Sequence, residues 1–432
     1  MIIIRRRTLS VILVILFFLM GFLSVRYLRR PRIRLGEHSI YINYRVKINP
    51  EKTYHLKLWD YKWPGENGAN WYQPFIAKMV SDFEKENLNI KVEVSLLDFQ
   101  SGPEEFSKAL ASGAAPDVYC SAYDLPDFNY QWQIPVGVFL KPQELDLYYP
   151  GLKELLTLEK YQLTLPRWSV PGIWIGNRSL MEKAGLSVER IQKQGWSWED
   201  LTKLKDKIEP ICIGNYSANG FLPQLLAVGN DLTEANIGKV LDLINLISGP
   251  LPQKMDYEAN MLPLFLSGKT LFLGGVRPLV YDFIKRKALE GRIPWEPVIL
   301  PVPSENPGRI ILPVESGVIG IYRHKKTKGD DQLVAAACLA YYISVYPQTA
   351  PWERLKVFPA VPAIAEKCLG NLGQEYYGPL TDWFSRGTVV NTKVGRRYQA
   401  EVYPVIKNYL SGKNSRQDME NIIRENFSGS DE

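Results

Sequence analysis

The chain has 432 residues, of which 46% are hydrophobic and 23% are charged. These proportions are ordinary for globular proteins, and they exclude a mainly disordered chain and a protein that crosses the membrane many times. Residues 1–34 contain eight Arg and no acidic residue, so the rest of the chain carries 44 basic and 46 acidic residues, a net charge of −2. Because a nucleic-acid-binding domain keeps its excess positive charge on the folded part, this distribution argues against a nucleic-acid partner.

Residues 8–25 contain no charge and are rich in apolar side chains, and Arg5, Arg6 and Arg7 precede them. An apolar run of about 18 residues is near the minimum that spans a bilayer, and a basic cluster in front of it is typical of a signal sequence. No A-x-A cleavage pattern follows, and Phe22 stands where a lipoprotein has its lipidated Cys. We therefore predict that residues 1–30 form an uncleaved signal anchor with one transmembrane helix.

The Arg residues around this segment favour the opposite orientation, because five follow it and only three precede it. Counted alone, these charges would place the body inside the cell. The case for an extracytoplasmic location must therefore come from the body of the chain.

After residues 31–51, which show no clear period and are predicted to be a stalk, strands and helices alternate. Strands are predicted at residues 55–59, 92–96 and 118–121 from their alternating or continuous apolar residues. Helices are predicted over residues 71–87, capped by Asn70, and between Pro103 and Gly113. Alternating strands and helices indicate an α/β domain with a parallel sheet. Further helices are expected at 331–345, at 415–425, and after Ser197, where a capping box begins.

The four cysteines stand far apart, at positions 120, 212, 338 and 368, and the three histidines are equally scattered. No CxxC or HExxH motif occurs, which excludes a dense disulfide framework and gives no metal site. We therefore expect no metal or other cofactor, and cysteines that are small buried apolar residues.

Several short motifs of the body occur in a recognisable order. They include FEKE at 83–86, IKVEV at 90–94, ALASGAAPDV at 109–118, GVFLKP at 137–142, MEKAGL at 181–186, WSWEDL at 196–201 and FLSGKTL at 265–271. Each is weak alone, but the ordered set, which extends over about residues 55–425, resembles bacterial extracellular solute-binding protein family 1. These are substrate-binding proteins of carbohydrate ABC importers, similar to maltose-binding protein. The chain departs from the family pattern at Gly176, where a Tyr is usual, and at Leu271-Phe272, where Ala-Met is usual.

The resemblance implies a type II periplasmic-binding-protein-like fold, in which two α/β lobes are joined by a hinge and the ligand cleft lies between them. Lobe one would comprise residues 52–166 and 300–346, and lobe two residues 167–299 and 347–428. The family works outside the cytoplasmic membrane, which outweighs the Arg distribution. The expected partners are a carbohydrate ligand, the permease subunits of an ABC transporter, and the membrane through the N-terminal helix. The protein would be a monomer and not an enzyme.

A sugar presents apolar faces and hydroxyl rims, so its site needs aromatic rings together with carboxylates, amides or Arg. In open α/β sheets such groups lie on loops at the carboxyl ends of strands. Trp59, Asp60 and Trp63 follow the first strand, and Tyr123 and Asp124 follow the third. Asp124 matches a position where relatives of the maltose-binding type often place a ligand-binding acid.

Other candidates are expected at the crossings between lobes and in lobe two. Trp168 lies in the first crossing segment, and two glycines after a strand would let the backbone approach the ligand closely. The remaining ligand candidates are Asn215, Tyr216, Asn219, Gly274, Gly275, Arg277, Glu315 and Ser316. Asp117, Trp196 and Trp198 are expected to be structural.

Two functions other than import stay open. A glycoside hydrolase needs two carboxylates on either side of the scissile bond, and Asp60 and Asp124 could converge, but nothing marks either as an acid with a raised pKa. A membrane-tethered sensor or adaptor of the same fold would instead signal to a membrane kinase, and the uncleaved anchor favours it. Neighbouring genes for a permease or for a histidine kinase would discriminate import from sensing.

Overall fold

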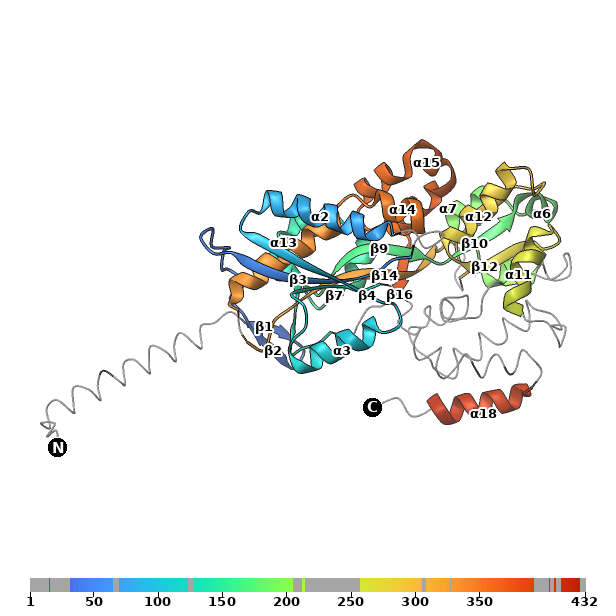
Figure 1. Ribbon diagram of the computed structural model, residues 1–432. Coiled ribbons are helices and arrows are strands. Elements are labelled where there is room, and N and C mark those ends of the chain that lie inside the picture. Colours follow the sequence, from blue (N-terminus) through green and yellow to red (C-terminus); the bar gives the residue numbers. More distant parts are fainter. Residues whose placement is uncertain are drawn as a thin grey trace, which may run out of the picture.

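The computed structural model describes residues 32–64, 70–122, 128–204, 212–213, 257–304, 308–326, 328–391 and 413–427, together with residues 15, 404 and 408. Within these residues the chain forms two main β-sheets that lie side by side along the molecule (Figure 1). A search of this part of the chain for a helix with the length and apolar character to cross a membrane finds none. Apart from Ile15, the predicted signal anchor at residues 1–30 lies outside the described residues.

The larger sheet has eight strands, in the order β15-β9-β14-β5-β3-β4, with β6 and β16 also paired to β14. Strand β3 is parallel to both β4 and β5, whereas β14 is antiparallel to β5 and β9. The strands are β3 (Tyr54–Tyr61), β4 (Ile90–Leu97), β5 (Val118–Cys120), β6 (Gln133–Ile134), β9 (Leu165–Pro171), β14 (Ile311–Tyr322), β15 (Phe358–Pro359) and β16 (Thr388–Asn391). Strands β3, β4 and β5 confirm the three predicted strands and their parallel arrangement.

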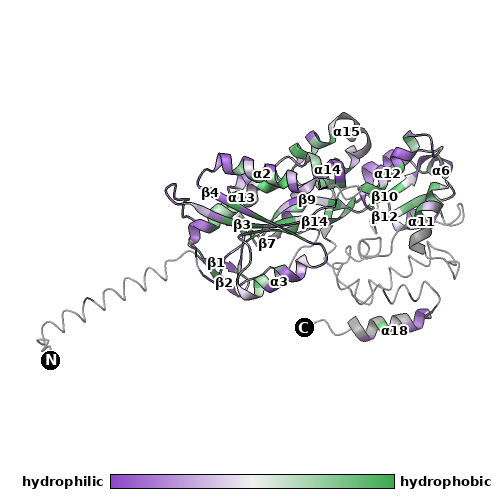
Figure 2. Cartoon of the chain, in the orientation of Figure 1, coloured by the Kyte–Doolittle hydropathy of each residue, from purple (hydrophilic) through white to green (hydrophobic). Residues whose placement is uncertain are grey.

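Helices cover both faces of this sheet (Figure 1): α2 (Tyr72–Glu86) and α13 (Asp330–Val345) lie on one face and α3 (Gly102–Ser112) on the other. Helix α3 ends at Gly113 in the left-handed conformation, as the sequence predicts. Figure 2 shows polar and apolar residues mixed on α2 and α3, which is typical of helices that bury one face. The buried face of α2 is turned from the predicted one: Met79 and Phe83 are buried, but Trp71 and Phe75 are only half-buried.

The smaller sheet has four strands in the order β11-β12-β10-β13, with β10 antiparallel to both neighbours. Its strands are β10 (Ile173–Asn177), β11 (Cys212–Ile213), β12 (Phe272–Val276) and β13 (Pro297–Leu300). The helices next to it are α6 (Arg178–Lys183), α7 (Val188–Gln194), α8 (Trp198–Thr202), α11 (Tyr257–Leu266) and α12 (Pro278–Leu289). The predicted capping box at the start of α8 is confirmed, because Ser197 and Asp200 exchange hydrogen bonds.

The remaining helices and strands are short or lie toward the ends of the chain. They are η2 (Val136–Phe139), α4 (Pro142–Leu145), α5 (Pro150–Leu155), β7 (Thr157–Leu158), β8 (Tyr161–Gln162), α14 (Thr349–Leu355), α15 (Pro362–Arg386) and α18 (Arg416–Phe427). Helices α13 and α18 fall where the sequence predicts them.

The chain passes between the two sheets at two places. Strand β9 continues into β10 with only Gly172 between them, and the return runs from β13 through residues 301–310 to β14. Residues 167–171 therefore belong to the larger sheet, although the sequence analysis assigned them to lobe two. They stay there because β9 is hydrogen-bonded on one side to β14 and on the other to β15. The full division of the chain into two lobes stays a prediction.

Residues 32–41, expected to be part of a stalk, instead form a hairpin of β1 (Arg32–Leu35) and β2 (His38–Tyr41). The side chains of Ile33, Leu35, Ile40 and Ile42 are buried and join the main hydrophobic core. A hydrogen bond from the Gly36 amide to Glu159 Oε1, at 2.7 Å, fixes the turn. The alternation of these apolar residues is a strand pattern that the sequence analysis did not use, so the segment is folded onto the larger sheet.

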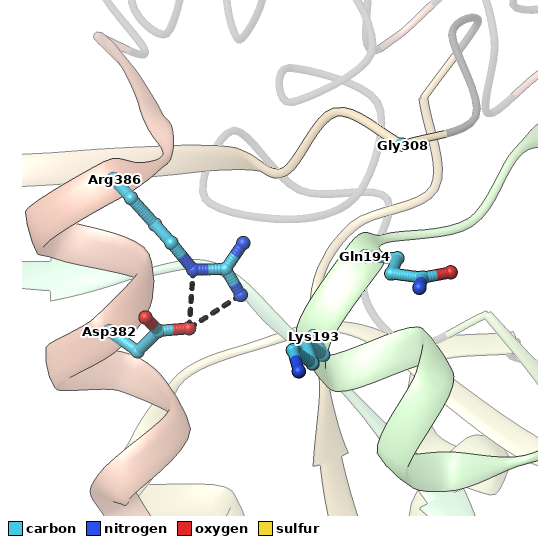
Figure 3. A pocket seen from close by; sticks show the side chains of 5 residues that line it. All are labelled: Lys193, Gln194, Gly308, Asp382 and Arg386. Carbon is cyan, nitrogen blue, oxygen red and sulfur yellow. Dashed lines mark hydrogen bonds and ion pairs between the residues drawn. The ribbon is translucent and has the colours of Figure 1, made fainter.

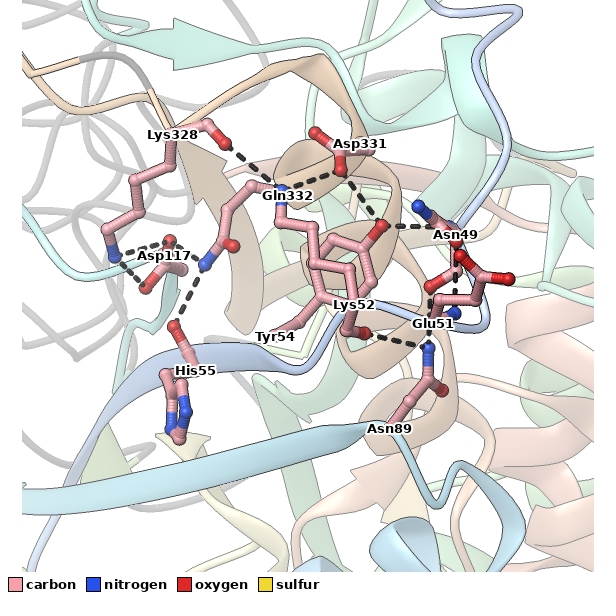
Figure 4. Close-up of polar contacts among 10 residues, drawn as sticks. All are labelled: Asn49, Glu51, Lys52, Tyr54, His55, Asn89, Asp117, Lys328, Asp331 and Gln332. Atoms are coloured by element: carbon pink, nitrogen blue, oxygen red, sulfur yellow. Dashed lines mark hydrogen bonds and ion pairs between the residues drawn. The ribbon is translucent and has the colours of Figure 1, made fainter.

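Residues 43–52 are also fixed, by polar contacts to the start of α13 (Figure 4). Lys52 Nζ lies 2.6 Å from Asp331 Oδ2, and the Tyr54 hydroxyl donates to the same oxygen. The Asn43 amide donates to Asp330 Oδ2 at 2.8 Å. The chain is thus held against the larger sheet from residue 32 onward.

Candidate functional site

The side chains that follow β3 meet the first crossing strand in a cluster of aromatic rings. Trp63 and Trp168 lie edge to face, with ring centroids 5.1 Å apart, and Phe99 lies 5.0 Å from Trp63. Trp63 is 3% exposed and Trp168 is fully buried. Two predicted ligand residues that are 105 positions apart in the sequence are therefore brought together, but in this conformation they contact each other.

Next to this cluster, Asp60 and Arg167 form a buried ion pair. Asp60 Oδ2 is 2.7 Å from Arg167 Nη1 and accepts a hydrogen bond from the Tyr72 hydroxyl. Burial alone would lower the pKa of Arg167, but the charge and hydrogen bond of Asp60, together with smaller contributions from Tyr72 and Cys120, more than offset it and raise that pKa, so the guanidinium stays charged. Since its carboxylate is buried and occupied, Asp60 organises the site in this conformation and does not present an oxygen to a ligand.

The same guanidinium also positions an aromatic ring. The carbon at the centre of the Arg167 group lies 4.2 Å from the centroid of the Trp168 ring, a cation–π contact. On the other side, a Cβ at Gly317 would come 2.2 Å from Trp168 Nε1, so only glycine fits opposite the indole. Trp168 is therefore held between the Arg167 guanidinium and Gly317 of β14.

Three further candidates lie where the two sheets approach each other. Arg277 follows β12 of the smaller sheet, and its Nη2 is 2.7 Å from Oε2 of Glu315 on β14 of the larger sheet. Ser316 Oγ lies 3.0 Å from Ser169 Oγ. Arg277 is one-third exposed and Glu315 is 11% exposed at the side chain, so this ion pair joins the two sheets close to solvent.

The two candidate glycines lie on β12, inside the smaller sheet. A Cβ at Gly274 would come 2.6 Å from the ring of Trp174. Packing against Trp174 therefore explains the glycine at this position, and no ligand is needed to explain it. Gly275 has a φ of 68°, which favours glycine. Trp59, on β3, is half-buried and packs on the main core.

Five predicted ligand residues lie outside the described part of the chain. They are Tyr123, Asp124, Asn215, Tyr216 and Asn219. Their roles stay predictions.

The residues that were expected to have structural roles, Asp117, Trp196 and Trp198, are buried. Trp196 is fully buried and donates to the Pro301 carbonyl, and Trp198 is 9% exposed. Burial alone would raise the pKa of Asp117, but hydrogen bonds from His324, the Lys57 amide and Gln332, with the charge of Lys328, hold that pKa below its usual value. Among the described cysteines, Cys120 is buried as expected, whereas Cys338 and Cys368 are only partly so; all three are free thiols.

A surface pocket of about 690 Å³ lies elsewhere, lined by Lys193, Gln194, Gly308, Asp382 and Arg386 (Figure 3). Among the described residues, none of those that line it is aromatic or a predicted ligand residue, and Arg386 is paired with Asp382 inside it. These lining residues supply polar groups but no ring surface of the kind that a sugar site needs.

The sequence analysis missed the roles of Arg167 and Tyr72. An Arg in the middle of the otherwise apolar strand β9 is a signal, because a buried cation needs a buried acid nearby. Which acid it meets depends on the pairing of strands, which the sequence did not reveal.

The solved structures that align with this chain include substrate-binding and sugar-binding proteins, which indicates the class of fold. The sugar-binding protein MalE from Xanthomonas citri aligns with a TM-score of 0.63 and 18% identity over 86% of this chain and 96% of its own. RafE from Streptococcus pneumoniae, in its apo form, gives a TM-score of 0.60 and 16% identity over 87% and 98%. The GacH receptor of Streptomyces glaucescens gives 0.55 and 19% over 87% and 98%. At these identities the likeness concerns the fold.

The family follows from the sequence itself. Residues 63–344 match the profile of the bacterial extracellular solute-binding proteins, and the chain belongs to this family. Comparison with the sequences of curated proteins finds no match. The resemblance inferred from the ordered motifs is therefore confirmed.

Proposed function

We propose that this protein is the extracytoplasmic binding component of an ABC importer that captures a sugar or oligosaccharide between two lobes and delivers it to a membrane permease. The observation that carries this proposal is the aromatic cluster of Trp63 and Trp168, fixed by the Asp60–Arg167 pair at the first crossing between the sheets. Planar rings beside polar groups are what a sugar face and its hydroxyl rim require.

The ligand class is supported by the structural relatives. They include the GacH receptor in complex with acarbose, a Listeria monocytogenes protein with cycloalternan, and a Thermotoga lettingae protein with α-D-tagatose. All three ligands are carbohydrates. Together with the family, they favour a carbohydrate for this chain.

Binding would proceed by closure of one lobe on the other around the ligand. The half-buried Trp59 would supply ring surface from lobe one, and Arg277 a forked donor from lobe two. Trp63 and Trp168, which pack on each other here, would add ring surface once that contact opens. Since Arg277 is paired with Glu315 across the sheets, a ligand that reaches both would take up hydrogen bonds now made between them. Tyr123, Asp124, Asn215, Tyr216, Asn219 and Ser316 would complete the polar rim.

The N-terminal segment would hold the protein on the outer face of the cell membrane as an uncleaved anchor, and the protein would act as a monomer. Protease added to spheroplasts should degrade the body and leave the anchor in the membrane. Full protection of the body would contradict export, and a mature N-terminus near residue 26 would contradict the anchor.

The ligand itself is tested by thermal shift across a panel of mono- and oligosaccharides, polyols and sugar acids. A true ligand at a hundredfold excess over its Kd stabilises the folded state by about 2.7 kcal/mol. Turnover of an oligosaccharide during incubation would instead support a hydrolase. A panel without any shift, for protein that is shown to be folded, would contradict the carbohydrate assignment.

A second candidate, a membrane-tethered sensor of the same fold, is favoured by one observation. The folded hairpin begins at residue 32, two positions after the predicted end of the anchor. A short distance in sequence between anchor and folded body suits a protein that transmits ligand occupancy to the membrane. Copurification of the detergent-solubilised full chain with permease subunits supports import, whereas copurification with a kinase supports sensing.

A further inference from the structure

The hairpin lies at the end of the larger sheet that is remote from the candidate site. Its His38 contacts Tyr130, just before β6, and β6 pairs with the end of β14. The end of β14 and the start of β3 lie at the same end of the sheet, because β14 runs antiparallel to β5 and β5 runs parallel to β3. Trp59 and Trp63 lie at the other end of β3. Figure 1 shows β1 and β2 on the side of the larger sheet away from β10 and β12.

Three contacts join the segments of this end into one surface. The ring of His38 stacks on Tyr130 with centroids 4.1 Å apart, and Arg323 Nε donates to the Gln131 carbonyl at 2.8 Å. The Asn43 amide reaches Asp330. We call the surface made by residues 32–52, 128–132 and 323–331, apart from residue 327, the basal surface.

The basal surface is basic, although the chain after residue 34 carries a net charge of −2. Its three segments contain nine Lys or Arg and four Asp or Glu, a formal charge of +5. Six of these cations are exposed, and in the part of the chain that the structure describes they form no ion pair: Arg32, Arg34, Arg45, Lys47, Lys325 and Lys326. Their charge is therefore not used inside the protein.

We infer that the basal surface rests on the anionic lipid headgroups of the membrane in which the chain is anchored. This inference relies on the anchor of the proposed function, because the apolar segment 8–25 ends seven residues before β1 and Arg26, Arg29 and Arg30 fill the interval. A folded hairpin that starts there begins at most about 20 Å from the end of the apolar segment, because six extended residues span no more than that. At physiological salt, charges act over about 8 Å, so the attraction operates once the hairpin approaches the headgroups. Basic residues next to an anchor are attracted to an anionic surface.

The contact would hold the larger sheet against the bilayer and leave the smaller sheet free to move. The apolar residues of the hairpin do not take part, since Ile33 and Ile40 are buried in the protein core. The attraction is therefore electrostatic, and it must weaken with salt and depend on lipid charge.

The test uses the full chain in nanodiscs of phosphatidylcholine alone or mixed with phosphatidylglycerol. A fluorescent amino acid at the exposed Ser39 serves as donor, and a headgroup-labelled lipid as acceptor. We expect more efficient energy transfer from donor to acceptor in the anionic discs than in the discs of phosphatidylcholine alone. This increase in transfer should disappear at about 1 M salt, where the screening length is about 3 Å. The triple variant Arg34→Glu/Lys325→Glu/Lys326→Glu should lose the rise at low salt.

The control is Lys183→Glu/Arg190→Glu/Lys193→Glu, which makes the same change in net charge at exposed positions beside the smaller sheet. It should keep the rise in transfer, and both triple variants should bind sugar as the parent does. Equal transfer in the two kinds of disc, with the chain retained after an alkaline wash, overturns the inference and leaves the anchor and the binding function intact. Release of the chain by the wash overturns the anchor, and the inference with it.

Discussion

At the scale of single residues, the site depends on a buried ion pair. Arg167 and Asp60 are both fully or almost fully buried, and Tyr72 shares the same carboxylate oxygen. Burying two charges is costly, so such a pair adds little net stability, but the loss of one partner leaves an uncompensated charge. We regard the pair as the element that fixes Trp168 beside β3.

The first prediction concerns this pair. Arg167→Met should reduce the free energy of unfolding by about 3–5 kcal/mol, because it leaves the Asp60 carboxylate buried without its cation. The double variant Asp60→Leu/Arg167→Met should cost less than this single change. Urea unfolding of the parent, of both single variants and of the double variant gives the coupling free energy between Asp60 and Arg167. Lys108→Ala, which removes an exposed ion pair on α3, is the control and should change little. Strictly additive losses would contradict the coupling.

The second prediction separates the three tryptophans. Trp63→Ala and Trp168→Ala should lower stability by about 3–5 kcal/mol, since both rings are buried against one another. Trp59→Ala, at a half-buried position, should cost less stability and, if its ring meets the sugar, weaken binding by about 1–3 kcal/mol, by analogy with stacking on bases. Melting temperature and affinity are both measured. If none of the three variants loses affinity at a saturating folded fraction, the aromatic platform is wrong.

At the scale of elements, the sequence predicted best where periodicity is strong and local. The ends of α3, α13 and α18 and the first three strands of the larger sheet were predicted to within a few residues. The hairpin at residues 32–41 was missed because its alternating apolar residues are interspersed with Arg32 and Arg34 directly after the basic segment, so that the alternation was not interpreted as a strand pattern. The contact of Asp60 with Arg167 joins strands that are not neighbours in the sheet, so no local pattern contains it.

The third prediction tests whether the hairpin is part of the folded body. Ile40 is 1% exposed, so Ile40→Ala should lower the free energy of unfolding by about 2–5 kcal/mol. Ser39→Ala, at the exposed neighbouring position, should have little effect. Both are measured by denaturant unfolding of the full chain. Equal stability of the two variants would mean that residues 32–41 are a free stalk after all.

The fourth prediction concerns Asp117, which connects β5 with α13 and the turn before it. Its pKa in the folded protein is below the unfolded value of about 3.9, so the unfolded state binds more protons near that pH. The stability that Asp117 contributes is therefore present above about pH 4 and is lost as the pH falls through the folded pKa. Asp117→Asn should be less stable at neutral pH and lose less on acidification. Asp98→Asn, at an exposed position, is the control. Parallel melting curves from pH 7 to acid for parent and Asp117→Asn would contradict this role.

At the scale of the whole molecule, motion between the two sheets should be confined to few residues. The predicted boundary between the lobes, at residues 166 and 167, falls inside β9, where Trp168 and Ser169 are paired with both β14 and β15. We therefore expect the first hinge at the junction of β9 and β10 around Gly172, whose amide donates to the Pro313 carbonyl of β14 at 2.8 Å. The second passage, residues 301–310, is longer, and its described residues form the isolated bridges Ser197–Ser304 and Val302–Ile311. The Arg277–Glu315 pair is a direct polar link between the two sheets beside these passages.

The last prediction follows from that link. Without ligand, Arg277 and Glu315 should bias the lobes toward the arrangement described here, so Arg277→Gln should increase the radius of gyration measured by small-angle scattering. High salt should have the same effect on the parent, because the pair is near solvent and is screened. Arg386→Gln, which breaks an ion pair within α15, is the control and should leave the scattering profile unchanged. A confirmed sugar should then close both parent and variant, since contacts to both lobes form only when they meet. A sugar that binds tightly without any change in the profile would replace the hinge by a rigid, preformed site.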